Sequence, residues 1–310
     1  MTWARPYTGD GTPRDVELPP APPWRRFPLP QIGDVYQPAP GLVDAVNAAL
    51  CLRRPLLLTG LSGSGKSTAI ESVAAELKLG KVLRWHITSR STLQDALYEY
   101  DVLGRIHAQQ LDPARKADDI AAFLRLGPLG TALLPRDTPR ALLIDEIDKS
   151  DLDLPSDLLE VLERGYFEIR ELIRHEQPEH TVADWDGEGR HVIRNGRVQC
   201  REFPFVIMTS NGERDFPAPF LRRCIRFDMP PLDAAALAAI IEAHLEGAAD
   251  RPGDTVLTPI IERFVSRIAR GETLAVDQLL NAAHLLAERG LTREERTGLE
   301  ALLLRGLSSA

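Results

Sequence analysis

The sequence predicts an α/β protein with a parallel five-stranded sheet, followed by a small helical domain. After Leu42, short apolar runs alternate with stretches of helical periodicity, which is typical of parallel sheets whose strands are joined by helices. After Pro231 the pattern becomes almost entirely amphipathic and helical. The first 40 residues instead hold ten of the 24 prolines, which prevent regular helices and sheet ladders. We therefore expect a proline-rich arm over 1–40, an α/β domain over 41–231 and a helical domain over 232–310.

The overall composition is that of a folded cytoplasmic protein. Of its 310 residues, 44% are hydrophobic and 26% are charged, which allows a sizeable buried core. No apolar run approaches the ~20 residues that span a bilayer, and the first residues lack the pattern of a secretory signal, so we expect no membrane partner. The formal net charge of -8 disfavours nucleic acid as the main partner, because phosphate binding requires basic surface.

Cysteine and histidine are scattered along the chain. Cys51, Cys200 and Cys224 lie far apart without a C-x-x-C pair, which argues against a disulfide framework or a zinc site, and we expect buried thiols. The seven histidines lack metal-ligand spacing, so we expect surface or packing roles for them.

The proline-rich arm has two open interpretations. Trp24, Phe27 and Tyr36 favour a strap docked along the body of the protein or along a neighbouring subunit. A disordered tail is the alternative, because the dense prolines remove backbone donors.

The expected strands and helices follow from apolar runs and helical spacing. Five apolar runs are the candidate strands: Pro55–Thr59, Val82–Ile87, Ala141–Ile144, Phe205–Ser210 and Ile225–Met229. A helix over Ser67–Leu79 stops at Gly80, and another over Ser156–Arg164 stops at Gly165. Four further helices are expected at the end of the chain: Ala235–Leu245, Pro259–Arg270, Leu274–Arg289 and Arg293–Leu307.

Two segments interrupt the α/β pattern. Residues 91–139 are too long for a plain crossover connection and predict an insertion. Residues 166–203 form a second one, in which Asn195-Gly196 between apolar-rich arms predicts a β-hairpin with a tight type I′ turn, just before the fourth strand.

A phosphate-binding loop is the strongest motif in the sequence. The segment Gly60-Leu61-Ser62-Gly63-Ser64-Gly65-Lys66-Ser67 fits G-x-x-x-x-G-K-[ST] and stands between an apolar run and a helix, with Thr68 next along the chain. Backbone N–H groups of such a loop surround a β-phosphate, the lysine reaches the β- and γ-phosphates and the serine hydroxyl binds Mg²⁺. The sequence therefore predicts ATP and Mg²⁺ as ligands of residues 60–68.

Two carboxylates end the third predicted strand. Asp145 and Glu146 follow an apolar run, and the carboxyl ends of strands border the crevice in which α/β sheets bind ligands. Asp145 is the candidate Mg²⁺ residue beside Ser67, and Glu146 the candidate base for the attacking water. A solvated acidic turn is the alternative for an isolated Asp-Glu pair.

Taken together, these motifs resemble AAA+ ATPases, and their details are similar to the MoxR branch. The resemblance covers roughly residues 36–300, and further matching segments are 56–60, 97–101, 126–130, 142–149 and 206–217. It implies a parallel five-stranded core with a C-terminal helical lid. It also implies that Asn211 is a polar sensor of the γ-phosphate, on a strand between those that hold the loop and Asp145; without the family, Asn211 before Gly212 is a turn residue.

The resemblance also implies residues that act between subunits. Arg223, with Arg222 second, lies in a segment similar to the one that supplies arginine fingers to the next subunit's active site. Surface cations paired with acidic neighbours are the alternative. The chain departs from the family at sensor 2, because residues 272–280 contain no arginine. Substitution by Arg267 or Arg270 is one alternative and a different coupling of the lid to nucleotide is the other, so no residue is assigned this role.

The function implied by the resemblance is that of a ring-forming ATPase, typically a hexamer, that remodels or activates a partner protein in the manner of a chaperone. A partner with a von Willebrand type A domain and a role in a bacterial conflict or defence system are implied by the family alone. Two alternatives stay open. One is an ATP-gated scaffold with slow hydrolysis, and the other is a DNA-directed motor, which the acidic charge disfavours.

Overall fold

The computed structural model describes residues 6–13, 15–26, 36–111, 120–187, 189–245, 254–272, 274–286 and 291–306. They form two compact units. The first contains residues 38–60 and 66–229, and the second contains the described residues of 1–37, 61–65 and 230–310. Each unit has a hydrophobic core of its own.

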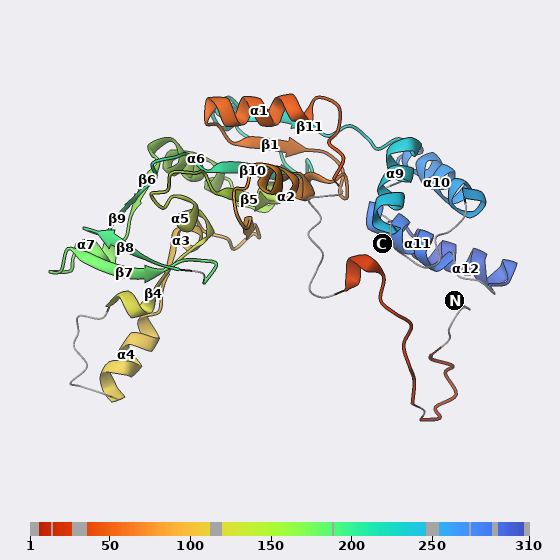
Figure 1. Cartoon of the computed structure of the whole chain (residues 1–310), viewed down its shortest axis with the longest axis horizontal. Helices are drawn as coiled ribbons and strands as arrows, with labels where there is room; N and C mark the ends of the chain where they lie inside the picture. Colours follow the sequence, from red (N-terminus) through yellow and green to blue (C-terminus); the bar gives the residue numbers. More distant parts are fainter. Residues whose placement is uncertain are drawn as a thin grey trace. The chain divides into compact units, whose positions relative to one another are not determined.

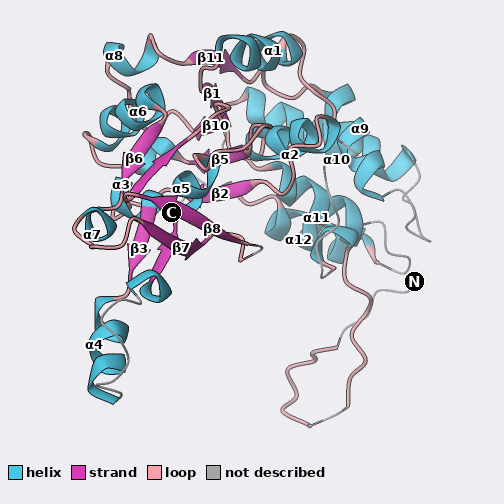
Figure 2. Ribbon diagram, turned by 60° about the vertical axis from the view of Figure 1, so that its left-hand side comes forward, coloured by secondary structure: helices cyan, strands magenta, loops and turns pink. Residues whose placement is uncertain are grey.

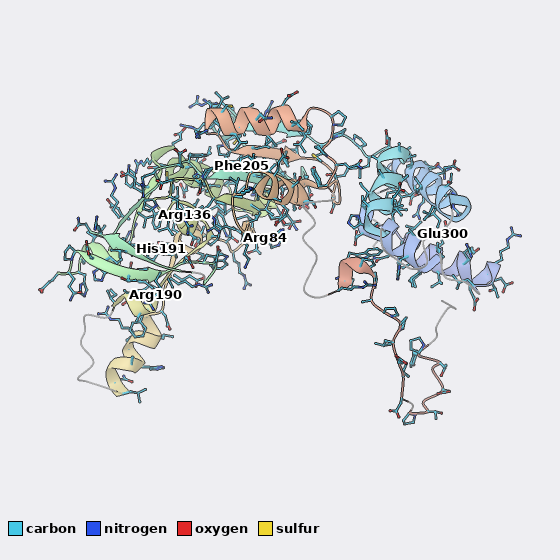
Figure 3. The ribbon with its side chains drawn as sticks, in the orientation of Figure 1. Arg84, Arg136, Arg190, His191, Phe205 and Glu300 are labelled. Carbon is cyan, nitrogen blue, oxygen red and sulfur yellow. The ribbon has the colours of Figure 1, made fainter. Side chains whose placement is uncertain are left out.

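The first unit is built on a parallel five-stranded sheet, as predicted (Figure 1). Its strands are β1 (Leu56–Thr59), β2 (Leu83–His86), β5 (Ala141–Asp145), β10 (Phe205–Ser210) and β11 (Ile225–Asp228). They lie in the order β11-β1-β10-β5-β2. The residues of β10, beginning at Phe205 (Figure 3), are all buried, which explains their continuous apolar pattern.

Two helices of the first unit, α2 (Lys66–Glu76) and α6 (Leu154–Arg164), correspond to its predicted helical segments, whereas α1 (Leu42–Leu52) was not predicted. Helix α1 packs against β1 and β11, and α2 packs against β5 and β10. Helix α6 begins two residues before the predicted start. It ends at Gly165, whose positive φ of 65° suits glycine at a helix C-terminus.

A second sheet unites the two predicted insertions (Figure 2). Residues 91–139 contribute β3 (Tyr98–Tyr100) and β4 (Leu124–Leu126), with helices α3 (Leu93–Leu97), α4 (Val102–Leu111) and α5 (Pro128–Ala132) and the short helix η3 (Ile120–Phe123). Residues 166–203 contribute β6 (Tyr166–Glu168), β7 (Glu179–Ala183), β8 (Arg190–Arg194) and β9 (Arg197–Gln199), with helix α7 (Arg170–Ile173). The strand order is β3-β4-β7-β8-β9-β6. Buried side chains of this sheet belong to the same hydrophobic core as the parallel sheet.

The predicted hairpin is confirmed within this sheet. Strands β8 and β9 pair antiparallel with Arg194 opposite Arg197, so the loop between them is Asn195-Gly196. Both loop residues have positive φ, 51° and 65°, as a type I′ turn requires. At the other end of β8, away from this turn, Nε2 of His191 (Figure 3) lies 3.1 Å from Asp184 Oδ2.

The second unit contains four helices among its described residues: α9 (Ala234–Leu245), α10 (Asp254–Ala269), α11 (Val276–Leu286) and α12 (Arg293–Leu303). All four occur near their predicted positions. Helix α10, however, begins five residues before Pro259, the predicted start, and continues through this exposed proline. Buried Ile260, Ile261 and Phe264 follow it, so packing of the apolar face overrides the local stop signal.

Two aromatic residues in the described part of the arm, Trp24 and Tyr36, are partly buried, and burial raises the pKa of Tyr36 to about 12. Trp24, in the short helix η1 (Pro23–Arg25), packs edge-on against His244 and His284 and donates a hydrogen bond from Nε1 to Asn281 Oδ1 over 3.3 Å. These residues belong to the same unit, so this part of the arm is docked rather than free. Phe27 lies outside the described residues.

The expectation of three buried thiols is wrong for one cysteine. Cys224 is buried and Cys200 is half-buried, whereas Cys51 is exposed. Helix α1 buries Leu42, Val46 and Ala49, and Cys51 lies outside this stripe. None of the helices in the described ranges is long and apolar enough to cross a membrane.

Candidate active site

Three neighbouring strands deliver the predicted site residues. The loop Gly60–Thr68 follows β1, Asp145 is the last residue of β5, and Asn211 follows the last residue of β10. Strand β10 lies between β1 and β5 and is parallel to both. The expected position of the Asn211 strand is therefore confirmed, and the carboxyl ends of the three strands lie on the same side of the sheet.

The loop has the backbone geometry of an anion cradle. Gly60, Gly63 and Gly65 have φ angles of 142°, 77° and 84°, which residues with a side chain rarely adopt. A Cβ atom at Gly60 would lie only 3.0 Å from Met229 Cβ. Ser64 Oγ is buried without a hydrogen-bond partner among the described residues. A phosphate bound in the loop would supply that partner, so the loop fits the predicted ligand.

Lys66 begins α2 and is almost completely buried, with 6% of its surface exposed. Its Nζ donates hydrogen bonds to Gly60 O over 2.7 Å and to Asn211 Oδ1 over 3.0 Å. Burial lowers the pKa of Lys66, because a charged ammonium is disfavoured away from water. Three carboxylates act in the opposite direction: Asp145, Asp148 and Glu146. A phosphate group beside this ammonium would favour its charged form in the same way.

Two hydroxyl groups converge on the carboxylate of Asp145. Ser67 Oγ donates to Asp145 Oδ1 over 2.8 Å, and Thr209 Oγ1 donates to the same oxygen over 2.6 Å. On the other side, Asp145 Oδ2 lies 3.9 Å from His86 Nδ1. Hydroxyl and carboxylate oxygens are the ligand atoms that Mg²⁺ prefers, so Ser67 and Asp145 fit the predicted metal.

Glu146 has a left-handed backbone, with φ 60° and ψ 49°. Such a conformation in a residue other than glycine costs about 1–3 kcal/mol and occurs where the surrounding structure holds it. Here the amide of Glu146 donates to Thr209 Oγ1 over 2.9 Å. Its carboxylate accepts from Asn211 Nδ2 over 3.3 Å and from Lys149 Nζ over 2.7 Å. The hydrogen bond to Glu146 also raises the pKa of Lys149.

Four residues at the site were not predicted from the sequence. Thr209 links Asp145 to Glu146, and Lys149 binds the Glu146 carboxylate. They are joined by two others, Asp148 and His86. The only sequence signal is proximity: Thr209 precedes Asn211 on its strand, and Asp148 and Lys149 belong to the matching segment 142–149.

Asp148 and His86 complete the site from different elements. Asp148 is 3% exposed, and its Oδ2 accepts from the backbone amides of Asn211 over 2.9 Å and Glu213 over 3.1 Å. Asp148 thereby fixes the backbone of Asn211, whose side-chain amide contacts Lys66 and Glu146. His86 ends β2 opposite Asp145, and its Nε2 lies 3.5 Å from Glu146 Oε2. The His86 side chain is 62% exposed, so its surface position agrees with the role expected for the histidines.

The two predicted finger arginines lie at the amino ends of the strands of the same sheet, opposite the carboxyl ends that carry the site. They precede β11, whose first residue, Ile225, pairs with Leu56, the first residue of β1. The structure therefore brings Lys66, Ser67, Asp145, Glu146 and Asn211 together and leaves Arg222 and Arg223 apart from them. Within its own chain Arg223 pairs with Glu163.

Arg222 is exposed, and its carbonyl accepts from Arg54 Nη1 over 2.9 Å. Of the two substitutes for sensor 2, Arg267 is held by Glu272, with Nε and Nη2 donating to Oε2 over 2.9 and 2.6 Å. These contacts describe one chain, so the predicted roles between subunits stay predictions.

Comparisons with known proteins place most of the first unit in a known family. The family described as "AAA domain (dynein-related subfamily)" matches residues 55–224, more than half of the chain. Among solved structures, one similar chain is domain III of the replication initiation protein DnaA from Thermotoga maritima. It has 15% sequence identity and a TM-score of 0.45, over 88% of this chain and 96% of that chain. No curated protein gives a significant match.

Proposed function

The chain belongs to the AAA domain family, in its dynein-related subfamily, and we propose that it hydrolyses ATP as an AAA+ enzyme. The MoxR type is proposed from the sequence resemblance over residues 36–300. One observation carries the proposal. The side chain of Asn211 hydrogen-bonds both Lys66, the predicted phosphate ligand, and Glu146, the predicted base. Beside this chain of contacts, Ser67 and Asp145 share a hydrogen bond at the predicted metal position.

Each residue then has a distinct role in hydrolysis. The loop amides and Lys66 bind the phosphates, and Ser67 and Asp145 hold Mg²⁺, which neutralises developing charge when bound. Glu146 accepts a proton from the attacking water, and Asn211 positions that water and the γ-phosphate. The left-handed backbone of Glu146 turns its carboxylate away from the strand direction and towards Asn211.

We also propose that the enzyme works as a ring, with a hexamer as the expected size, and remodels or activates a partner protein. The position of Arg222 and Arg223 supports the ring, because they lie at the amino ends of the strands, away from the site of their own chain. A neighbouring copy that presents the amino ends of its strands would deliver a guanidinium to the site. The proposed partner is a protein with a von Willebrand type A domain.

The test of hydrolysis compares wild-type protein with Glu146→Gln. The variant keeps the size and hydrogen-bonding shape of the side chain but cannot accept a proton, so it should bind ATP and release no measurable phosphate. Glu99→Gln, at an exposed position of β3, is the matched control and should keep wild-type turnover. Phosphate release by Glu146→Gln at the wild-type rate would remove Glu146 as the base.

The test of assembly is sedimentation with and without ATP and Mg²⁺. A nucleotide shared between subunits adds contacts only in the assembled state, so it should shift the protein from small species to a ring. A monomer under both conditions at micromolar protein contradicts the ring. Partners can then be sought by purifying the protein with the products of neighbouring genes and measuring which of them changes the ATPase rate.

One observation favours the scaffold alternative with slow hydrolysis. The Glu146 carboxylate is already bound by Lys149 and Asn211, and a base that accepts two hydrogen bonds is less available to a water molecule. Turnover by Lys149→Ala distinguishes the two functions. An increase over wild type indicates that the Lys149 contact restrains hydrolysis, whereas an unchanged rate favours a fully active enzyme.

A further inference from the structure

The second sheet ends in a strand with one free edge. Strand β6 is the last in the order β3-β4-β7-β8-β9-β6, and its partner is β9. Gly165 O accepts from Cys200 N over 2.9 Å, and Ile169 N donates to Gly196 O over 2.7 Å. In an antiparallel pair these contacts alternate along the strand. The backbone groups of the even-numbered residues 166 and 168 therefore point away from β9, towards the free edge.

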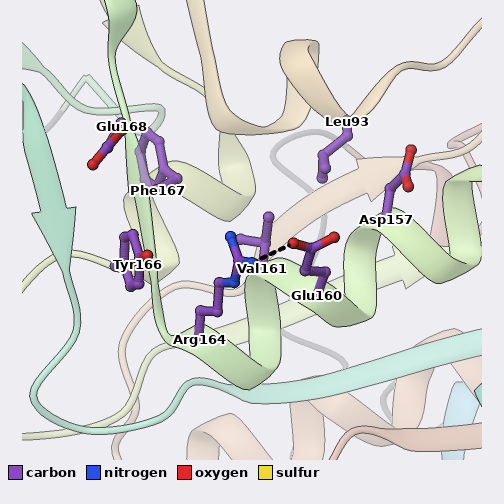
Figure 4. A pocket seen from close by; sticks show the side chains of 8 residues that line it. All are labelled: Leu93, Asp157, Glu160, Val161, Arg164, Tyr166, Phe167 and Glu168. Atoms are coloured by element: carbon purple, nitrogen blue, oxygen red, sulfur yellow. Dashed lines mark ion pairs between the residues drawn. The ribbon is translucent and has the colours of Figure 1, made fainter.

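A cavity of about 300 Å³ adjoins this strand (Figure 4). Its lining comes from α3, α6 and β6: Leu93, Asp157, Glu160, Val161, Arg164, Tyr166, Phe167 and Glu168. Three consecutive residues of β6 contribute, and none of β9 does. Because successive side chains alternate between the two faces of a sheet, three in a row border one cavity only at the edge of the strand. The cavity therefore lies along the free edge of β6.

The cavity combines an apolar floor with an acidic rim. Leu93, Val161 and Phe167 pack against the main hydrophobic core and form the floor. The rim carries three carboxylates and one cation, Arg164, whose Nη2 lies 2.7 Å from Glu160 Oε1.

Two rim carboxylates remain after this pair. Within the described part of the chain, Asp157 and Glu168 form no ion pair, and both are exposed. Beside the lining, Arg197, the β9 partner of Glu168, places its guanidinium over the Tyr166 ring. With this second cation, one net negative charge remains at the rim beside apolar surface. This combination attracts a group that is apolar and cationic, and it repels the phosphates of nucleic acids.

We propose that the groove between β6 and α6 (the β6 groove) binds an extended basic segment of a partner protein. The segment pairs its backbone with residues 166 and 168, as a strand added to the sheet. One apolar side chain enters the cavity over Phe167, and lysine or arginine side chains meet Asp157 and Glu168. Charge complementarity selects this occupant, and the unpaired backbone groups require an extended chain. The proposal is independent of ATP hydrolysis, because the groove is built from residues outside the candidate active site.

The test is fluorescence anisotropy with the full-length protein, without nucleotide. The probe is a labelled peptide in which lysine alternates with valine and leucine. A matched peptide has glutamate in place of lysine, and a third is N-methylated at alternate amides. The lysine peptide should bind, and the glutamate peptide about tenfold more weakly because it meets like charges. The N-methylated peptide should lose about as much, since it cannot donate to the strand edge.

Charge reversal in the protein provides the matched test. The double variant D157K/E168K should weaken binding of the lysine peptide about tenfold. Glu99→Lys makes the same kind of change on β3, at the other edge of this sheet, and should bind like wild type. All of these variants should keep the wild-type ATPase rate, so failure of this proposal and failure of the proposed hydrolysis are separate results.

Three outcomes overturn the proposal. Equal binding of the N-methylated peptide excludes strand addition. Equal weakening by Glu99→Lys indicates general attraction to an acidic surface. Self-association that D157K/E168K abolishes, together with no peptide binding, assigns the β6 groove to a second copy of this chain instead.

Discussion

Asn211 Nδ2 donates a hydrogen bond to Glu146 Oε1 over 3.3 Å, while Oδ1 of the same amide accepts from Lys66. One amide thus contacts the group that binds phosphate and the group that accepts a proton. Its backbone is held as well, by the hydrogen bond from Asn211 N to Asp148 Oδ2 over 2.9 Å. The amide is therefore positioned before any ligand binds, which is what catalysis by orientation requires.

Asn211→Ala should reduce turnover far more than ATP affinity. The amide orients the reacting groups, whereas the loop and Lys66 supply most of the phosphate contacts. By comparison with other preorganised donors, kcat should fall about 10²-fold, with Kd for ATP within a few-fold of wild type. Steady-state kinetics and equilibrium binding of a fluorescent ATP analogue measure the two effects. Equal losses in kcat and affinity would assign Asn211 to ground-state binding.

Lys66→Ala should abolish ATP binding. The substitution removes the one buried ammonium beside the loop, and no other lysine of the described site is as deeply buried. Lys149→Ala is the matched control, because Lys149 also borders the site but is exposed and binds only the Glu146 carboxylate among the described contacts. That control should bind ATP with near wild-type affinity in the same assay. Comparable affinity losses in both variants would mean that general positive charge, not Lys66, holds the phosphates.

Thr209→Val should impair the metal site and the fold together. Thr209 is 1% exposed, and its hydroxyl both donates to Asp145 Oδ1 and accepts from Glu146 N. Valine leaves that amide without a partner in a buried place, which costs about 1–3 kcal/mol of unfolding free energy. The substitution also removes the hydrogen bond that orients the Asp145 carboxylate, so the Mg²⁺ concentration that gives half-maximal ATPase activity should rise. Thr209→Ser keeps the hydroxyl and should restore the Mg²⁺ dependence; if it does not, side-chain packing explains the defect.

Mixing two inactive variants should restore ATPase activity if Arg222 and Arg223 act on a neighbouring subunit. The double variant R222A/R223A keeps its loop and base but lacks the guanidinium, and in other systems such a loss reaches about 10³-fold or more. The Glu146→Gln variant lacks the base in its own site but keeps both arginines. Mixed oligomers contain interfaces where an intact base meets an intact arginine, so their activity should exceed the sum of the separate proteins. No recovery, once mixed oligomers are shown to form, rules out this arrangement.

Alkylation should distinguish the cysteines of the folded protein. Burial raises the pKa of Cys224 to about 12, so at pH 8 its thiol carries almost no reactive thiolate and is shielded from reagents. Cys51 is exposed on α1 and should react first with iodoacetamide. Mass spectrometry of the native protein should find Cys51 modified and Cys224 unmodified, and both modified after denaturation in urea. Early modification of Cys224 in the native protein would contradict its buried position.

Features that depend on neighbouring residues could be predicted from the sequence. The loop Gly60–Thr68, the Asp145-Glu146 pair and the Asn195-Gly196 turn were predicted at the right places, because glycine conformations, strand ends and turn geometry are set over a few residues. The five strands of the parallel sheet were also predicted to within two residues of their observed ends. The continuous apolar runs of β1, β5 and β10 reflect burial on both faces, which is visible without knowing the partners. In β2 and β11 more buried and more exposed residues alternate instead.

The residues that surround these features come from distant parts of the chain, and the tertiary fold brings them together. Thr209 reaches Asp145 across 64 positions of sequence, and His86 lies beside Glu146 because β2 is adjacent to β5 in the sheet. In the same way, two separate insertions combine into one sheet and leave β6 with a free edge. Such contacts depend on strand order and register, and these are fixed by long-range backbone hydrogen bonds and by how the apolar faces pack, which no local pattern of residues specifies.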